Sequence, residues 1–257
     1  MTKALVILSG GQDSVTCLFW AKEHFDEVHA ITFDYGQRHR IEIKSAEKVG
    51  LLAKVASHSF FEVPGILKSC SPLTSNTELE QYENAAQMES TIGSRVELTF
   101  VPMRNAFFFT IAMNHAIALD CYDLVTGVCQ EDNANYPDCT DDFREAFEFM
   151  ANTSLGTNGK SSTIRYKLHA PLMYLNKADT VHMMHQMGPE AWDALAYTHT
   201  SYDGKYPPTD MNHANVLRAS GFEKAGLPDP LVLRAVSEGL MELPLTENYN
   251  AKEKKSL

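Results

Sequence analysis

Residues 4–14 read ALVILSGGQDS, an apolar run followed by two glycines between serines and an acidic residue. The run Ala4–Leu8 predicts a buried strand, and Val15–Glu23 carries apolar residues at helical spacing. Two glycines let a backbone approach an anion closely, and the first amides of the following helix face that anion. The stretch therefore predicts a phosphate-binding loop made of Ser9, Gly10, Gly11, Gln12, Asp13 and Ser14.

This loop differs from the GxxxxGK[ST] motif, because no lysine closes it. A loop without that lysine suits a pyrophosphate that leaves better than transfer of a γ-phosphate. Asp13 either caps the helix or holds a magnesium ion against the phosphates. The structural alternative is an ordinary strand-to-helix turn with serine and aspartate as capping residues.

Outward from the loop, strands and helices alternate. Val28–Phe33 predicts a second strand, Ile41–Leu52 a helix and Ser59–Val63 a third strand. This alternation predicts an α/β fold with a doubly wound, mainly parallel sheet and helices on both faces. Later segments predict the strands Leu124–Val128 and Tyr166–Leu172 and the helices Arg104–Leu119, Asp138–Met150, Asn176–Gln186 (capped by Asn176), Asn212–Ala225 and Asp229–Gly239.

The chain is expected to form a nucleotide-binding α/β domain over residues 1–190 and a small C-terminal helical region over 191–247. Residues 68–97 are rich in Ser, Thr, Asn and Glu and predict a long loop or lid. The chain is expected to be irregular from Gly188 to Asn212, and the tail 248–257 to be frayed.

Composition excludes several classes of protein. The 257 residues are 44% apolar, which is enough for a core, and the net charge of −11 disfavours bulk attraction to nucleic acid or an anionic membrane. No apolar run reaches the ~18 residues of a membrane helix, and no signal peptide is expected at the N-terminus. Five cysteines without a CxxC pair predict neither a disulfide framework nor a cysteine zinc site. We therefore expect a cytoplasmic protein.

Six motifs in order along the chain resemble one known family. SGGQDS itself resembles the PP-loop of N-type ATP pyrophosphatases, which cut ATP between the α and β phosphates. The wider pattern is similar to the QueC-type 7-cyano-7-deazaguanine synthases from about Lys3 to Gly221. The matching segments are SGGQDSVTCL (9–18), TFDYGQRHR (32–40), FVPMRN (100–105), TGVC (126–129), YPDC (136–139) and PLMYLNKADT (171–180).

The resemblance implies an adenine nucleotide alpha hydrolase-like fold and an ATP-dependent ligase of the queuosine pathway. Such an enzyme adenylates the carboxylate of 7-carboxy-7-deazaguanine, and ammonia then displaces AMP. The resulting amide is activated in turn and eliminated to the nitrile. ATP and Mg²⁺ are the implied cofactors, and a homodimer is the expected assembly.

The resemblance also implies three groups of site residues. The catalytic group is Ser9, Asp13, Ser14, Arg38 and Lys177. The ATP-binding group is Leu8, Ser9, Gly10, Gly11, Gln12, Asp13, Ser14, Phe33, Arg104 and Gly127. The substrate group is Tyr35, Gln37, Arg38, Arg104, Asn105, Asp132 and Asp138.

Some of these residues have a structural alternative. Arg38 can meet a phosphate or a carboxylate, or it can belong to a solvated helix start. Asp138 can accept from the N1–H and amine of a guanine-type edge, or it can cap the helix that begins there. Lys177 can contact phosphate, or it can be a solvated lysine near a helix start.

The sequence departs from the family at two places. Met103 stands where the family has glycine, and the four zinc cysteines are replaced by Ser201, Thr209, Asn212 and Asn215. Neutral hydroxyls and amides are poor zinc ligands, so we expect no zinc. These departures leave open an enzyme that stops at the amide or acylates a protein amine, as QueC-like proteins of phage and antiviral gene clusters do. They also leave open a nucleotide-binding module without catalysis.

Overall fold

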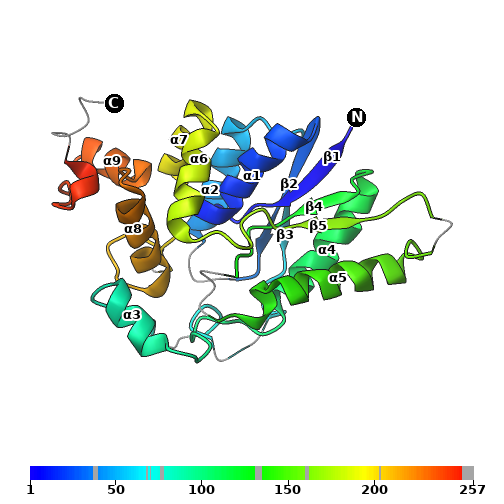
Figure 1. Cartoon of the computed structure of the whole chain (residues 1–257), viewed down its shortest axis with the longest axis horizontal. Coiled ribbons are helices and arrows are strands. Elements are labelled where there is room, and N and C mark those ends of the chain that lie inside the picture. Colours follow the sequence, from blue (N-terminus) through cyan, green and yellow to red (C-terminus); the bar gives the residue numbers. More distant parts are fainter. Residues whose placement is uncertain are drawn as a thin grey trace.

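Five parallel strands form the centre of the molecule in the computed structural model, in the order β3-β2-β1-β4-β5 (Figure 1). The strands are β1 (Lys3–Ile7), β2 (Glu27–Asp34), β3 (His58–Glu62), β4 (Asp123–Val125) and β5 (Lys167–His169). The structure describes residues 1–36, 40–67, 69, 71–75, 78–130, 135–159, 162–202 and 204–250.

The strand order makes the fold doubly wound, as predicted. From β1 the chain runs to β2 and β3 on one side, and later to β4 and β5 on the other. Figure 1 shows α1, α2, α6 and α7 on one face of the sheet and α4 and α5 on the other. The direction of winding reverses between β1 and β4, and ligands bind doubly wound folds outside such a reversal point.

The helices carry these bounds. They are α1 (Gln12–His24), α2 (Ile41–Leu52), α3 (Ala85–Ile92), α4 (Arg104–Ala118), α5 (Asp141–Ser154), α6 (Lys177–Gln186), α7 (Pro189–Ala194), α8 (His213–Ala225) and α9 (Pro230–Ser237). The described residues also contain the short 3₁₀ turns η1 (Pro137–Cys139), η2 (Leu195–Tyr197) and η3 (Glu247–Tyr249). Among the described residues, no helix has the length and apolar character needed to cross a bilayer.

Each face of the sheet has its own hydrophobic core. Because side chains of a strand alternate between faces, Leu5 and Val6 of β1 lie fully buried in opposite cores. Val6 packs with residues of α1, α2 and α6. Leu5 packs on the α4 side, where Phe33 of β2 and Phe108 of α4 stack with ring centroids 4.4 Å apart. These aromatic residues lie beside the end of β2 and so form one wall of the site described below.

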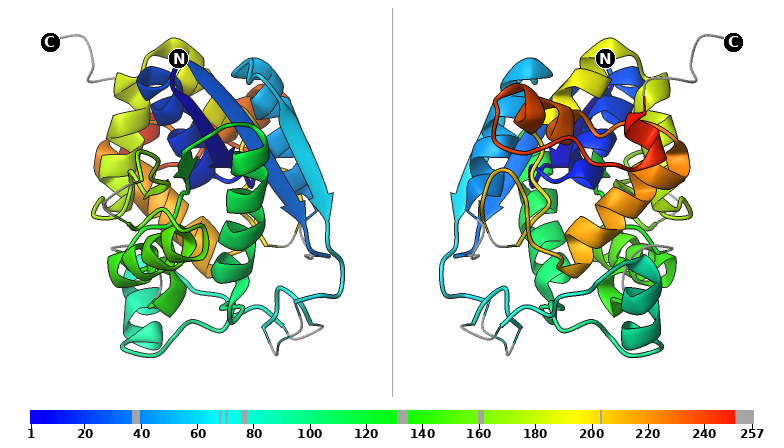
Figure 2. Two further views of the ribbon diagram at one scale, coloured as in Figure 1. Left: turned by 90° about the vertical axis from the view of Figure 1, so that its right-hand side faces the viewer. Right: turned by 90° about the vertical axis from the view of Figure 1, so that its left-hand side faces the viewer.

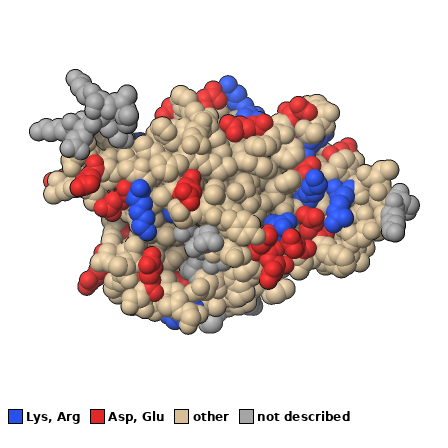
Figure 3. All heavy atoms as spheres, viewed as in Figure 1, with Lys and Arg blue, Asp and Glu red and all other residues tan. Residues whose placement is uncertain are grey.

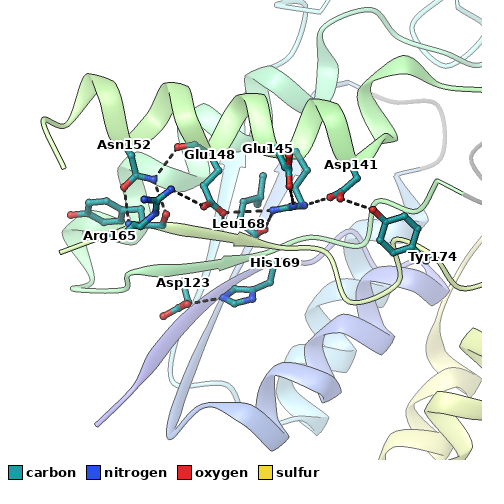
Figure 4. A network of polar contacts seen from close by, with 11 residues as sticks. Asp123, Asp141, Glu145, Glu148, Asn152, Arg165, Leu168, His169 and Tyr174 are labelled. Carbon is teal, nitrogen blue, oxygen red and sulfur yellow. Dashed lines mark hydrogen bonds and ion pairs between the residues drawn. The ribbon is translucent and has the colours of Figure 1, made fainter. Parts of the chain in front are cut away.

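Helix α5 covers the free edge of β5 (Figure 4). Glu148 accepts from the Leu168 amide at 3.0 Å, and Arg144 donates to the Leu168 carbonyl at 3.3 Å. One turn further, Asn152 pairs with both backbone groups of Tyr166, at 2.8 and 3.0 Å. Residues 144, 148 and 152 are four apart and therefore share one helix face. That face binds backbone groups of β5 and its neighbour Tyr166 that a sixth strand would otherwise bind. The edge of the sheet is therefore not open to pairing with another chain.

Charges gather around the same helix. Arg144 makes ion pairs with Asp141, Glu145 and Glu148, and Figure 3 shows acidic and basic side chains close together over α5 and β5. Figure 4 shows Glu148 on the side of α5 that faces β5, and Asp123 of β4 paired with His169 of β5. The charged side chains of α5 thus form ion pairs with one another, and Arg144 and Glu148 also bind the backbone of Leu168.

Most predicted elements differ from the observed ones at one or both ends, and α1 begins at Gln12, three residues before the predicted helix start at Val15. The predicted strands Leu124–Val128 and Tyr166–Leu172 are only three residues long as β4 and β5. The predicted helix Asp138–Met150 begins later, at Asp141, because the Thr140 hydroxyl accepts from the Phe143 amide at 3.2 Å and caps α5 there. Asp138 lies in η1 before the cap.

The region 68–97, predicted as a long loop, contains α3. Asn84 caps this helix by accepting from the Gln87 amide at 2.9 Å. Met88 and Ile92 are four residues apart and pack against Val216 of α8. Figure 2 shows the chain leaving β3 and running along the molecule to α3. The helix is therefore stabilised by its contact with α8. Because Val216 is more than a hundred residues away in the sequence, the residues around α3 do not reveal this contact.

The C-terminal part packs on the α/β core through α8 and α6. The stretch from Gly188, predicted to be irregular, forms α7 and η2, with Pro189 at the first helical position. The predicted frayed tail is ordered at its start, where Asn248 donates to the Leu227 carbonyl at 3.1 Å and Tyr249 accepts from the Asp229 amide at 3.3 Å. Residues 251–257 lie outside the described residues.

Candidate functional site

The loop Ser9–Ser14 joins the end of β1 to the start of α1, as predicted. The Ser14 hydroxyl donates to the Gly11 carbonyl at 3.0 Å and accepts from the Ser9 amide at 3.1 Å. The Ser9 hydroxyl in turn accepts from the Gly11 amide at 3.2 Å. These short-range bonds fold the loop tightly and leave the first turn of α1 facing the end of the sheet. Amides in the first turn of a helix have no partner within the helix and so suit an anion.

Two glycines are required by close contacts at this point. Gly10 has φ +91°, and a Cβ there would lie 2.2 Å from the Glu42 carbonyl oxygen of α2. Gly127 follows β4, and a Cβ there would lie 3.0 Å from the Ser14 amide nitrogen. The backbone after β4 therefore touches the phosphate loop across the reversal point of the sheet.

Asp13 lies beside Lys177, the first residue of α6. The Lys177 ammonium donates to both Asp13 carboxylate oxygens, at 2.8 and 2.9 Å. The Lys177 side chain is 10% exposed and that of Asp13 is 33% exposed. Asn176 precedes them as the cap of α6 in a capping box with Asp179, which confirms the predicted cap. Lys177 is therefore buried in the wall of the cavity described next and is not a solvated lysine.

A cavity of about 300 Å³ opens beside this loop. Twelve of the predicted site residues line it, from the loop, β2, α4, the turn after β4 and α6. They are Leu8, Ser9, Gly11, Gln12, Asp13, Ser14, Phe33, Tyr35, Arg104, Asn105, Gly127 and Lys177. Gly10 and Asp138 lie next to lining residues and are not themselves in the wall. Gln37, Arg38 and Asp132 lie outside the described residues.

Arg104 is the cation at the end of the cavity that faces α4. It is hydrogen-bonded to the Tyr35 phenol. Burial works to lower the pKa of Arg104, but the phenols of Tyr35 and Tyr136 work to raise it, and the net direction is upward. Arg104 therefore stays charged in an enclosed, aromatic setting, which suits a planar anionic or heteroaromatic ligand.

Asp138 binds Asn105, the residue that follows Arg104 in the first turn of α4. Its carboxylate accepts from the Asn105 amide at 3.2 Å, and its carbonyl accepts from the Asn105 side chain at 3.0 Å. Asp138 is 6% exposed, and burial raises the pKa of its carboxyl. The structural alternative raised above is thus corrected: Asp138 caps the start of α4, while Thr140 caps α5.

Gln12 is a buried polar group that points to a missing contact. It is 3% exposed and lines the cavity, and both polar atoms of its amide lack a hydrogen-bond partner within the described part of the chain. Leaving such a group unpaired is costly. A ligand with polar atoms would complete it.

Several lining residues were not predicted from the sequence. Tyr136 comes from the turn before η1, and a second set comes from the C-terminal region: Thr200, Tyr202, His213, Ala214, Leu217 and Arg218. Helix α8 reaches the cavity only because it packs on α6. The sequence offered one indication of this contribution: His213, a polar residue able to bind a ligand, follows Asn212, which caps α8.

Three of the four positions that hold zinc cysteines in the family contact one carboxylate, that of Asp210. The Ser201 hydroxyl and the side-chain amides of Asn212 and Asn215 all donate to the carboxylate of Asp210. Ser201 and Asn212 are at most 1% exposed. No group of three or more potential metal-ligating side chains occurs within the described ranges. A carboxylate therefore links three of these positions.

Comparison with known proteins shows the family to which the chain belongs. The family model described as "Queuosine biosynthesis protein QueC" matches residues 3–226. The 7-cyano-7-deazaguanine synthase of Gloeobacter violaceus is 44% identical over 232 residues, covering 90% of this chain and 96% of that protein. The synthase of Laribacter hongkongensis is 43% identical over 235 residues, covering 90% and 94%. A solved 4-thiouridine synthetase–RNA complex with bound ATP matches with TM-score 0.44 and 15% identity, over 93% of this chain and 50% of that one. By its family match and its relatives, the chain belongs to the QueC family of queuosine biosynthesis proteins.

Proposed function

We propose that this protein is an ATP-dependent ligase that converts 7-carboxy-7-deazaguanine and ammonia into 7-cyano-7-deazaguanine. It is a member of an enzyme family whose curated relatives are 7-cyano-7-deazaguanine synthases. The observation that carries the proposal is the shared cavity, in which the phosphate loop and Arg104 line the same space. A nucleotide and a small aromatic acid can therefore meet there.

The first step activates the acid. A carboxylate is a poor electrophile because oxide would have to leave. Attack of one carboxylate oxygen on the α-phosphate of ATP forms an acyl-adenylate and releases pyrophosphate. Ammonia then attacks the acyl carbon, AMP leaves, and the nitrogen loses a proton to give the amide. The amide oxygen then attacks the α-phosphate of a second ATP and releases pyrophosphate. AMP leaves with that oxygen while the nitrogen loses its two protons, which gives the nitrile.

The loop serves the departing pyrophosphate. The amides of Gln12 and Asp13 and the first-turn dipole of α1 stabilise negative charge as it develops. Lys177 and Ser14 add a cation and a hydroxyl at the same place. Arg38 is proposed to meet the phosphate or carboxylate from the segment after β2.

Magnesium is proposed to bind at Asp13. Mg²⁺ in nucleotide sites is held by one or two carboxylates together with phosphate oxygens and water, and Asp13 offers one partly exposed carboxylate to the cavity. Bound there, the ion would neutralise phosphate charge. Lys177 already donates to both Asp13 oxygens and would have to share them.

The acid is proposed to lie toward α4. Arg104 and Tyr35 form a charged and aromatic wall, and Asn105 and Gln37 add amides. Asp138 is proposed to read the guanine-type edge, although its carboxylate now supports the Asn105 amide. Asp132 is proposed as a further contact. A homodimer in the cytoplasm remains our prediction for the assembly and its location.

A second candidate function keeps the adenylation and changes its outcome. Met103 replaces a family glycine directly before Arg104, and its side chain is 69% exposed. This change favours a different acceptor, so the enzyme would stop at the amide or acylate a protein amine. A nucleotide-binding module without catalysis is the third candidate, against which the complete set of loop contacts argues.

One experiment separates these candidates. Purified protein is incubated with ATP, Mg²⁺, ammonium and 7-carboxy-7-deazaguanine, and products are followed by mass spectrometry and by pyrophosphate release. Nitrile supports the first function, and amide or a protein adduct supports the second. Absence of acid-dependent pyrophosphate release would leave only the binding module.

A further inference from the structure

The cavity is closed on one side by residues 198–202 and 204–213, here called the closing segment. Its Thr200 and Tyr202 line the cavity together with His213, the first residue of α8. The His199 amide donates to the Gly10 carbonyl at 2.9 Å, which ties the start of the closing segment to the phosphate loop. His213 is the last residue of the closing segment, so its position depends on the contacts that hold the two ends of this segment.

Arg218 of α8 holds the beginning of the closing segment. It donates to the hydroxyls of Thr198 and Thr200, at 2.8 and 2.9 Å. It also forms a two-contact ion pair with Asp229, at 2.6 and 2.8 Å. Arg218 is 3% exposed, so this anchor is rigid and shielded from water.

Asp210 holds the end of the closing segment. Its carboxylate accepts from the side chains of Ser201, Asn212 and Asn215, and its carbonyl accepts from the Asn215 amide group at 3.0 Å. Asn212 also caps α8, because its side chain accepts from the Asn215 backbone amide at 3.1 Å. The residue that follows the cap is His213, so the Asp210 contacts fix where its imidazole enters the cavity.

The His213 imidazole is enclosed and makes no hydrogen bond with any described residue. It is 9% exposed and lines the cavity. Burial lowers its pKa; Glu97 works to raise it and Lys177 to lower it. The ring is therefore neutral near pH 7, with one nitrogen that donates and one that accepts.

The two charged groups that His213 faces locate it within the cavity. Lys177 is paired with Asp13 at the phosphate loop. Glu97 accepts from the phenol of Tyr136 at 3.2 Å, and Tyr136 lines the cavity near Arg104. His213 therefore lines the same cavity as Lys177 and Tyr136 and feels the charges of both Lys177 and Glu97.

We propose that His213 is a specificity-determining residue that hydrogen-bonds the organic acid, and that Asp210 is the positioning residue that holds it there. This rests on the proposed function, because the ligand is the 7-carboxy-7-deazaguanine named above. The His213 imidazole lines the cavity without a hydrogen bond to any described residue, and a carboxylate or ring heteroatom of the acid can supply one. ATP bound at the loop does not depend on this contact.

The test measures binding and turnover separately. Binding of 7-carboxy-7-deazaguanine alone is measured by titration calorimetry, and steady-state pyrophosphate release is measured against acid and against ATP. His213→Leu is expected to weaken acid binding and raise its KM roughly tenfold, the effect of one hydrogen bond to a charged ligand, with the KM for ATP unchanged. His213→Gln keeps a donor and is expected to restore most of the affinity.

Asp210→Asn tests the positioning role. An amide cannot accept from three donors as the carboxylate does, so the variant is expected to show the acid defect of His213→Leu with the histidine intact and the ATP KM unchanged. Circular dichroism checks folding, and His213→Gln stays informative if another variant does not fold. Asp210→Glu keeps the charge and is expected to recover part of the affinity.

The outcomes separate this proposal from the proposed function. Wild-type acid affinity in His213→Leu overturns the role of His213, whatever the turnover. Normal acid affinity in a folded Asp210→Asn overturns the positioning role. If wild-type protein binds the acid but releases no pyrophosphate, the proposed function fails while His213 is still judged by the binding data. If wild-type protein does not bind the acid, both fail.

Discussion

Lys177 donates to both carboxylate oxygens of Asp13, at 2.8 and 2.9 Å, although the two residues are 164 positions apart in the chain. The pair joins the second residue of α1 to the first residue of α6. It therefore brings a cation to a phosphate loop whose own sequence contains none. The lysine comes from the start of α6, the helix that follows β5.

Removing either member of this pair is expected to slow pyrophosphate release. Lys177→Met and Asp13→Asn are each expected to lower kcat by about 10²–10³. The first removes a cation at the departing phosphate, and the second removes the carboxylate that orients this cation and is proposed to hold Mg²⁺. The double variant is expected to be little worse than the worse single variant, since the two side chains act together. Steady-state pyrophosphate release checks this.

Lys22→Met provides the matched control for that comparison. Lys22 lies in the last turn of α1 and is exposed, so its removal is expected to leave kcat unchanged. Full activity in a folded Asp13→Asn variant would contradict the role of the pair.

Met103→Gly is expected to stabilise the protein by about 1 kcal/mol. Met103 precedes α4 with φ 64° and ψ 7°, a left-handed conformation that costs a residue with a Cβ about 1–2 kcal/mol. Glycine removes that strain but loses more freedom on folding. Denaturant unfolding of the two proteins measures the difference. Met103→Ala keeps a Cβ and is expected to change stability little; equal gains from both substitutions would show that strain is not the cause.

Asn152→Leu is expected to destabilise the fold by about 2–4 kcal/mol. Asn152 is fully buried and bonds both backbone groups of Tyr166 beside β5. Leucine would leave that amide and carbonyl unpaired, which costs about 1–3 kcal/mol for each group. Urea unfolding measures the loss. Glu145→Gln on the same helix, with a side chain 69% exposed, is the control and is expected to stay within about 0.5 kcal/mol.

His58 is expected to make stability fall as pH falls from 6.5 toward 4. Burial lowers the pKa of His58 from 6.5 to about 4. Because the Thr32 hydroxyl donates to the Leu8 carbonyl, the His58 Nε2–H donates to Thr32 at 2.8 Å, and Nδ1 faces Gly50. Between these pH values the unfolded state binds more protons than the folded state, so the free energy of unfolding rises with pH.

The measurement compares the pH slope of the unfolding free energy in the wild type and in His58→Gln. Glutamine keeps a donor for Thr32 and does not titrate, so the variant is expected to have a shallower slope between pH 4 and 6.5. Identical slopes would show that His58 titrates alike in the folded and the unfolded state.

Elemental analysis of the purified protein is expected to find no stoichiometric zinc. Ser201, Asn212 and Asn215 donate to Asp210 and offer no thiolate. The variant S201C/T209C/N212C/N215C is the positive control and is expected to bind about one zinc ion per chain. One zinc ion per wild-type chain would refute the prediction.

Local sequence determined the phosphate loop and the elements around it. The strand, the turn at Gly10 and the helix that follows lie within one short window, and so does the Asn176 cap of α6. Patterns of this kind depend on neighbours three or four residues apart. The predicted helix Ile41–Leu52 is confirmed to the residue for the same reason.

Tertiary structure alone decided the contacts between distant segments. Lys177 meets Asp13 because α6 packs beside α1, and His213 reaches the cavity because α8 packs on α6. Helix α3 forms within a region of loop-like composition because Met88 packs against Val216 of α8. The composition of a segment describes its own preferences, whereas such contacts depend on where the chain returns after a hundred residues or more.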